Sequence, residues 1–259
     1  MEKKKGINGS TLKMIAIVTM LIDHIGAAVL ARLLMVNGLG ELDQTNTDAI
    51  MQWLSANGAL YGTYTVMRMI GRVAFPIFCF LLVEGFLHTH DVKKYAMRLG
   101  LFALLSEIPF DLAFSSKILE FNYQNVFFTL FIGLLTMIAY RAVEEKEEWG
   151  QAWKVILYIL IVAAGMALAY FLKTDYAEKG VFCIMVLYIF RKKKMWQLIA
   201  GCASFIWETP PLFGFIPIAF YNGTRGWKMK YFFYIFYPAH LLILYLLCYF
   251  MGISGYSAV

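Results

Sequence analysis

Apolar runs of about 20 residues recur along this chain, and a helix needs about that length to cross the hydrocarbon layer of a membrane. The first run extends from Met14 to about Val36, has no small-residue cleavage site after it, and is longer than the apolar part of a signal peptide. We interpret it as a retained first span. The composition agrees: 61% of the 259 residues are hydrophobic and 15% are charged, whereas soluble domains carry about 25% charged residues. Soluble enzymes and disordered chains are therefore excluded.

The sequence predicts an all-α, polytopic membrane helix bundle that forms a single domain over residues 1–259. Nine spans are expected, at residues 12–36, 66–87, 95–114, 124–141, 154–172, 178–190, 195–207, 209–221 and 231–251. Pro210 and Pro211 separate the seventh span from the eighth, and proline disfavours a helix at the residue before it. We expect a tight hairpin of two short helices there, with one long broken helix as the alternative. Residues 37–65 are expected to form a long external loop that carries a short amphipathic helix at 48–54.

Basic residues predict the orientation of the chain. Most of the 23 Lys and Arg residues fall in alternate connections, within residues 3–13, 93–98, 141–154, 191–194 and 225–230. Positive charge collects on the cytoplasmic side. The N-terminus is therefore expected inside and the C-terminus outside, in the plasma or inner membrane. This distribution explains the net charge of +6 better than binding to nucleic acid does.

Metal and disulfide chemistry are not predicted. The four cysteines lie inside apolar runs and have no CxxC spacing, so they are interpreted as small buried hydrophobic residues. The stretch His88-Thr89-His90-Asp91 contains metal-ligating residue types, but a solvated turn is the simpler interpretation.

Several ionisable residues fall inside the predicted spans. A charged side chain at the middle of a bilayer costs roughly 2.5–3.5 kcal/mol on insertion scales, so each one needs a partner or a function. We expect these residues to converge on a polar cavity inside the bundle. They are Asp23, His24, Arg72, Glu84, Glu107, Asp111 and His240.

The two histidines are expected at the same depth. His24 lies about 18 Å along the first span and His240 about 14 Å from the same side along the last one, at a rise of 1.5 Å per residue. Histidine suits proton abstraction because its unperturbed pKa is near 6.5. Asp23 is adjacent to His24 and points about 100° away on a helix, so we expect it not to orient that imidazole directly.

Three further charged residues allow two interpretations. Arg72 lies in the outer half of the second span, and Glu107 and Asp111 lie in the outer half of the third. Arg72 can form a buried ion pair with either carboxylate, or the three residues can contact a substrate.

Lys13 is also open to two interpretations. It precedes His24 by eleven residues, which is about 16 Å along a helix. A long anionic donor such as an acyl-coenzyme A could leave its phosphates at Lys13 and extend its pantetheine arm to His24. The alternative is an ordinary positive anchor at the cytoplasmic edge.

In the stretches that contain these residues, the sequence resembles the TraX family of membrane proteins, named for acetylation of F-pilin. The stretches that carry the resemblance span almost the whole chain. They are Gly9–Ala16, Met20–Gly26, Gly71–Phe78, Val83–Phe86, Ser106–Asp111, Asn125–Leu130 and Phe236–Leu241.

The resemblance implies transfer of an acyl group, most simply acetyl, from acetyl-CoA to an amine or hydroxyl. The family is similar in outline to the acyltransferase-3 superfamily, where an arginine precedes an essential histidine by the spacing of Lys13 and His24. Lysine keeps the charge of that arginine without its bidentate geometry. The acceptor is expected to be a protein N-terminus, a glycan or a small molecule.

The resemblance and the buried charges together give one functional hypothesis and one rival. His24 acts as the base or carries the acyl group, Asp23 and His240 tune it or relay the proton, and Lys13 binds the donor. The acceptor cavity is expected to contain Arg72, Glu84, Glu107, Asp111 and Asn125. The rival is a proton-coupled transporter or flippase that uses the same residues as a relay.

Overall fold

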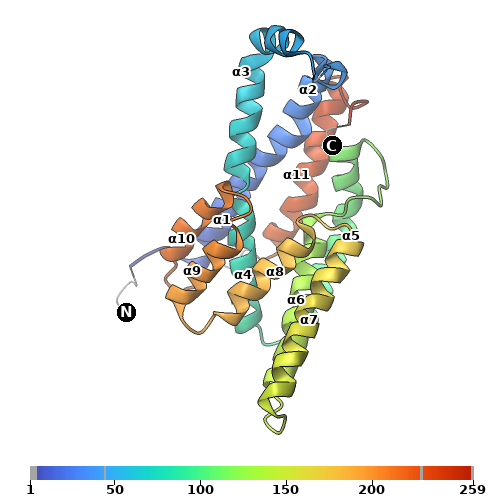
Figure 1. The fold of residues 1–259 in the computed structure, drawn as a ribbon. Coiled ribbons are helices and arrows are strands. Elements are labelled where there is room, and N and C mark those ends of the chain that lie inside the picture. Colours follow the sequence, from blue (N-terminus) through green and yellow to red (C-terminus); the bar gives the residue numbers. More distant parts are fainter. Residues whose placement is uncertain (1–4, 44, 228–229, 258–259) are drawn as a thin grey trace. The chain divides into compact units, whose positions relative to one another are not determined.

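The computed structural model describes residues 5–43, 45–227 and 230–257, and within them the chain is all-helical, as predicted (Figure 1). Its elements in chain order are α1 (Gly9–His24), η1 (Ile25–Leu30), α2 (Ala31–Val36), η2 (Leu39–Glu41), α3 (Thr47–Gly71), α4 (Ala74–His88), α5 (Val92–Ser115), α6 (Val126–Glu144), α7 (Gln151–Phe171), α8 (Ala177–Ile189), α9 (Lys194–Ser204), η3 (Pro210–Gly214), α10 (Phe215–Ala219) and α11 (Lys230–Phe250).

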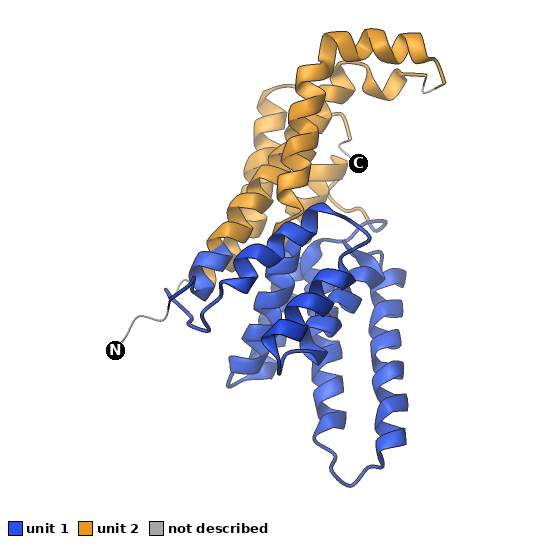
Figure 2. Ribbon diagram, turned by 60° about the vertical axis from the view of Figure 1, so that its left-hand side comes forward, with its two compact units in different colours: residues 1–13, 75–106, 121–228 blue, residues 14–74, 107–120, 229–259 orange. Residues whose placement is uncertain are grey.

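The chain divides into two compact units, coloured separately in Figure 2. Unit 1 comprises residues 1–13, 75–106 and 121–228, and unit 2 comprises residues 14–74, 107–120 and 229–259. The single domain over residues 1–259 stays a prediction, and residues 1–4, 44, 228–229 and 258–259 lie outside the described part. Two of the predicted basic groups, at residues 3–13 and 225–230, extend into these positions.

Unit 2 is built around η1, which packs against α3 and α11. This element is a π-helix, in which the Ala31 N–H bonds to the Gly26 carbonyl five residues back. Gly26, Ala27 and Ala28 are buried there, and their small side chains let the neighbouring helices approach. Short π-helical segments are rare and occur frequently at functional sites. This one begins directly after His24.

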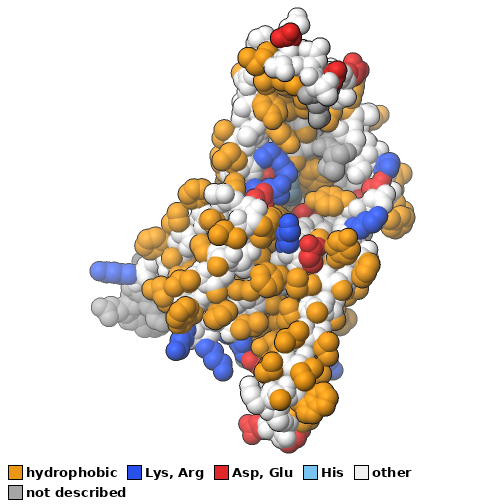
Figure 3. All heavy atoms as spheres, viewed as in Figure 1, with side chains coloured by type: hydrophobic (Ala, Val, Ile, Leu, Met, Phe, Trp, Pro, Cys, Tyr) orange, Lys and Arg blue, Asp and Glu red, His pale blue; other side chains and the backbone are white. Residues whose placement is uncertain are grey.

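Unit 1 contains the hairpin of α6 and α7, against which α8 packs, followed by α9. Asn125 caps α6 by accepting the Phe127 N–H. Along α7, among the described residues, only Gly165 and Ala169 are buried. Hydrophobic side chains cover the visible face of this hairpin in Figure 3, and exposed residues such as Trp153 and Ile159 belong to it. An apolar surface of this extent is typical of a helix that faces lipid.

Five helical segments in the described part are long and apolar enough to cross a membrane. They are Gly9–Val36, Thr47–His88, Val126–Glu144, Gln151–Phe171 and Tyr231–Phe250. The chain is therefore a helical membrane protein. The count of nine spans is not confirmed, because α8 has 13 residues and α9 has 11, fewer than the 17 or so that a crossing requires. The orientation of the N-terminus stays a prediction.

The two short helices predicted at residues 195–221 are present, because α9 is followed by η3 and α10 and packs against α10. Their crossing of a membrane is not confirmed. Residues 210–214 form a 3-10 helix and α10 has only five residues, which is about 8 Å of helix. Pro210, Pro211 and Pro217 supply no backbone N–H. This helical stretch is therefore shorter than the length that a membrane crossing requires.

The predicted long external loop is wrong, because most of residues 37–65 belongs to α3. Asn46 caps this helix by accepting the Ala49 N–H at 3.1 Å. No proline occurs between Thr47 and Gly71, so the helix continues for 25 residues instead of ending near Leu54. The chain breaks only at Arg72 and Val73, before α4 begins.

Candidate active site

His24 and His240 meet inside unit 2. Nδ1 of His24 lies 2.6 Å from Nε2 of His240. The two ring planes are parallel within 1° and the centroids are 4.9 Å apart. Since the bonded nitrogens lie between the centroids, the rings meet edge to edge in one plane and do not stack face to face. The structure thus brings together the two histidines expected at matched depth.

The acceptors around this pair determine which nitrogens carry hydrogen when both rings are neutral. Nδ1 of His240 lies 2.7 Å from the Phe236 carbonyl, and a carbonyl only accepts, so Nδ1 carries the hydrogen. A neutral imidazole has one N–H, so Nε2 of His240 must accept from Nδ1 of His24. Nε2 of His24 is then left with a lone pair. It has no hydrogen-bond partner among the described residues.

Aromatic side chains surround the two imidazoles. Phe114 and Tyr237 present ring edges to His24, with centroids at 5.5 and 5.9 Å. Phe236 stacks on His240 at 4.8 Å. This apolar enclosure limits rotation of the rings and keeps the hydrogen bond between them in a low dielectric, where it is stronger than in water.

Asp23 turns away from His24, as expected for adjacent residues on a helix. Its Oδ2 accepts a hydrogen bond from Nη1 of Arg68 at 2.8 Å, which joins α1 to α3. Gly71 allows α1 and α3 to approach this closely, because a Cβ at that position would lie 1.9 Å from the Cβ of Asp23. Arg68 falls outside the basic groups that predict the orientation of the chain. No local pattern pointed to its partner on α1.

Arg32 is another arginine of unit 2, and its guanidinium is 0% exposed. Nε donates to the Tyr256 carbonyl, Nη1 to the carbonyls of Ala28 and Ala113, and Nη2 to Leu112 O and Ser116 Oγ. These five bonds occupy all five N–H groups of the side chain. Leu112 and Ala113 lie in the last turn of α5, whose carbonyls have no partners within the helix. Arg32 therefore caps α5 and ties the C-terminal segment to it.

The charged residues expected to form the acceptor cavity in unit 2 have different environments. Asp111 is 1% exposed, and its Oδ2 accepts the Glu120 N–H at 2.8 Å, so it supports the turn after α5. Glu107 is half-buried one helical turn earlier. Arg72 is half-buried at the C-cap of α3, and its charge and that of Arg68 both act on His24.

The remaining cavity residues belong to unit 1. Asn125 is fully buried, and besides capping α6 it donates from Nδ2 to the Ala103 carbonyl at 2.8 Å. Glu84 accepts a hydrogen bond from the Tyr221 hydroxyl, and burial together with this carboxylate raises the pKa of Tyr221 to about 12. Both residues thus have intramolecular roles within unit 1.

Lys13 lies in the first turns of α1 and belongs to unit 1, where the charge of Arg225 acts on it. The start of α1 is fixed to the loop that carries Arg225. The Ser10 N–H donates to the Arg225 carbonyl at 3.0 Å, and Ser10 Oγ accepts the Trp227 N–H at 3.0 Å. Two cations near the N-terminal end of a helix form a local positive field, which suits an anionic group.

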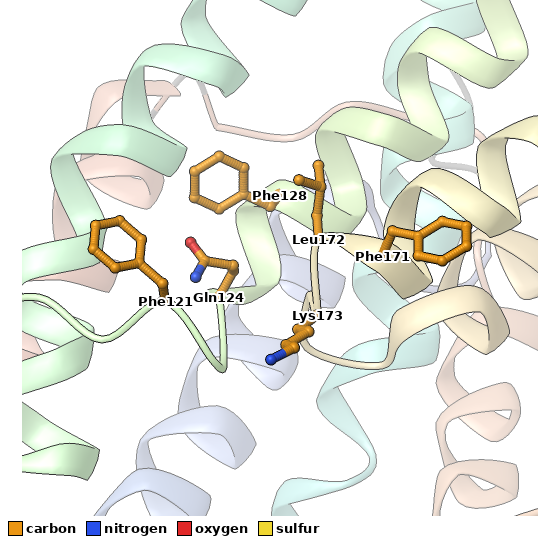
Figure 4. Close-up of a pocket in the computed structure, with 6 residues that line it drawn as sticks. All are labelled: Phe121, Gln124, Phe128, Phe171, Leu172 and Lys173. Atoms are coloured by element: carbon orange, nitrogen blue, oxygen red, sulfur yellow. The ribbon is translucent and has the colours of Figure 1, made fainter.

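An open hollow of about 270 Å³ occurs elsewhere in unit 1. Its walls are mostly apolar and come from the loop before α6 and the end of α7, as Figure 4 shows. The lining residues are Phe121, Gln124, Phe128, Phe171, Leu172 and Lys173. None of the predicted site residues lines it, so it offers no base or nucleophile from that set.

Comparison with known proteins places the chain in a family. It matches the model of the TraX protein family over residues 8–248 and therefore belongs to that family. It is 27% identical over 210 residues to a probable fimbrial assembly protein FimC, serogroup H1, of Dichelobacter nodosus; the alignment covers 70% of this chain and 82% of the relative. No solved structure matches the chain.

Proposed function

We propose that this TraX family member is an integral-membrane acyltransferase that moves an acetyl group from acetyl-CoA to an amine or hydroxyl of an acceptor at the membrane. One observation carries the proposal. The hydrogen-bonded chain from the Phe236 carbonyl through His240 ends at Nε2 of His24, which holds a lone pair. A half-buried and oriented nitrogen that holds a lone pair when the ring is neutral is suited to general-base catalysis.

The proposed reaction begins with proton removal by this nitrogen. Nε2 of His24 removes the proton from the acceptor O–H or N–H while the acceptor atom attacks the thioester carbonyl carbon. The tetrahedral intermediate collapses with cleavage of the C–S bond. The proton passes from His24 to the departing thiolate, so that the products are acetylated acceptor and free coenzyme A.

His240 acts as a positioning residue in this scheme. It fixes the tautomer of His24 and continues to accept from Nδ1 when His24 becomes an imidazolium. A hydrogen bond donated by a charged group is stronger than one donated by a neutral group, so His240 favours the protonated state that the reaction forms.

The donor and the cavity complete the proposed site. Lys13 receives a phosphate of acetyl-CoA, eleven residues before His24 on α1. In unit 2, Arg72 and Glu107 contact the acceptor, and the contact of Glu84 in unit 1 stays a prediction. Asp111 is engaged with a backbone group of unit 2, and we assign it to holding the wall of the acceptor cavity there. Asn125 holds the backbone within unit 1. The name of the FimC relative supports an exported fimbrial subunit as the first acceptor to test.

The rival transporter uses the histidines as a proton relay. A relay needs a group at each end that takes up and releases a proton, and the chain described above ends on a backbone carbonyl. A carbonyl orients a histidine but does not release a proton. This feature favours an oriented base over a proton path.

Thermal unfolding in acetyl-CoA tests the proposal. Ligand that binds only the folded state stabilises it by about 2.7 kcal/mol at 100 times Kd, so the wild-type transition should move upward. Lys13→Gln should reduce the shift, and Lys192→Gln, an exposed residue of another predicted cytoplasmic group, should leave it unchanged. An unchanged wild-type transition, together with solute flux driven by a proton gradient, would favour the transporter instead.

A further inference from the structure

Two arginines of unit 2, the buried Arg32 and the half-buried Arg68, differ in how many of their N–H groups have a hydrogen-bond partner. Arg32 has all five engaged. Arg68 makes one hydrogen bond, to Asp23, and its other N–H groups have no partner among the described residues. Its side chain is 26% exposed. A guanidinium inside a membrane does not leave N–H groups facing lipid, because the cost is several kcal/mol. These groups therefore face a polar space.

Arg68 is held beside the base. Its guanidinium bonds to Asp23, the residue before His24. Its stem lies along Gly26, where an added Cβ would be 3.6 Å from the Cδ of Arg68. The side chain therefore lies along the first span from Gly26 in η1 to Asp23 in α1, past the level of His24, and its charge acts on that imidazole.

We propose that Arg68 is a catalytic residue that donates N–H groups to the oxyanion formed during acyl transfer, and that Asp23 is the positioning residue that holds it. This inference rests on the proposed acyl transfer. When the acceptor attacks, the thioester carbonyl oxygen becomes negatively charged. An N–H of Arg68 that has no protein partner donates to this oxygen, and the bond weakens when the C–S bond breaks and the carbonyl re-forms.

The proposal also explains why Asp23 is next to His24 without contacting it. The single hydrogen bond from Nη1 of Arg68 to Oδ2 of Asp23 anchors the guanidinium beside α1 and leaves its Nε and Nη2 N–H groups for another acceptor. Donors fixed before the reaction stabilise developing charge without reorganising. Asp23 thus acts on the reaction through Arg68.

Substitution of Arg68 provides the test, with acetyl transfer and thermal unfolding measured on the full-length protein. Removing one oxyanion donor lowers kcat by about 10²–10³-fold in other enzymes. We expect that loss in Arg68→Gln, with KM for acetyl-CoA changed less than about twofold, because the bond forms only in the transition state. Arg68→Lys keeps the charge beside Asp23, but an ammonium lacks the planar fork of a guanidinium. Its kcat should therefore lie between those of wild type and Arg68→Gln.

A charge exchange separates catalysis from structural pairing. Asp23→Arg combined with Arg68→Asp restores an ion pair between α1 and α3 but moves the guanidinium. We expect the unfolding temperature to recover towards wild type while kcat stays low. Arg191→Gln is the matched control, because it breaks the Arg191–Glu144 ion pair of unit 1, at 2.7 Å, and should lower stability without changing kcat.

The outcomes are distinct. If Arg68→Gln or Arg68→Lys retained wild-type kcat, or if the exchanged pair restored it, the oxyanion role would be overturned and acyl transfer would stand. If the wild-type protein transferred no acetyl group, the proposed function would fail, and the assignment of Arg68 with it.

Discussion

Two arginines of one helical unit illustrate how a membrane protein uses buried charge. Arg32 is fully enclosed, and its guanidinium donates to the Ala28 carbonyl of η1, to the end of α5 and to the C-terminal segment. Arg68 is partly accessible and contacts one carboxylate beside His24. The difference shows that burial alone does not identify a functional residue. Unsatisfied hydrogen-bonding capacity next to an oriented base is the more specific signal, and it distinguishes the candidate site from the structural clamp.

Replacement of Arg32 should give the largest change in stability. Arg32→Met removes five donors and leaves the carbonyls of Leu112 and Ala113, at the end of α5, without the partners that Arg32 supplies. We expect a loss of about 3–5 kcal/mol, because each unsatisfied buried acceptor costs about 1–3 kcal/mol. Unfolding in mixed micelles measures this loss. Turnover per folded molecule should change little, and a variant as stable as wild type but inactive would reverse the assignment of roles.

Replacement of His240 should affect activity more than stability. His240→Phe removes the acceptor for Nδ1 of His24, whereas His240→Gln can keep it through the amide oxygen. Orienting partners of functional histidines commonly contribute about 10–100-fold. We expect a loss of that size in the Phe variant and a smaller one in the Gln variant. Acetyl transfer measured on both variants checks this, and equal activities would contradict the proposed tautomer.

Two glycines of α3 offer a smaller, paired test of the crossing that holds Arg68. In Gly71→Ala the new Cβ meets Asp23 at 1.9 Å, and overpacking of this kind costs at least about 1 kcal/mol. At Gly58 an added Cβ meets nothing within 4 Å, so Gly58→Ala should stabilise the helix by about 0.5–1 kcal/mol. Thermal unfolding separates the two, and equal shifts would contradict the close approach of α1 and α3.

Much of the helical pattern was predictable from the chain. Long apolar runs located α6, α7 and α11 to within a few residues, because lipid-facing helices need continuous hydrophobic surface. The first connection was not predictable from hydropathy, since polar residues in α3 resemble those of a loop. The length of the helix predicted after Pro210 was overestimated, because an apolar composition does not compensate for three prolines in eight residues.

The candidate site was predictable in its residue types but only partly in its contacts. Histidines at matched depth indicated the pair of His24 and His240, since both lie on regular helices whose rise is known. The pairing of Asp23 with Arg68 depends on where α1 and α3 cross, and the sequence separation of 45 residues contains no signal for that contact. The π-helix after His24 likewise has no sequence pattern that hydropathy detects.

Turnover of labelled acetyl-CoA by wild type and His24→Gln tests the central claim most directly. The purified protein in nanodiscs would be given acetyl-CoA with a peptide bearing a free N-terminus, a serine peptide or a glucosamine oligomer, and labelled product and released thiol would be counted together. The account predicts equal amounts of both from wild type and a loss of about 10²–10⁴-fold in the variant, with its unfolding temperature nearly unchanged. Transfer at the wild-type rate by His24→Gln would contradict it.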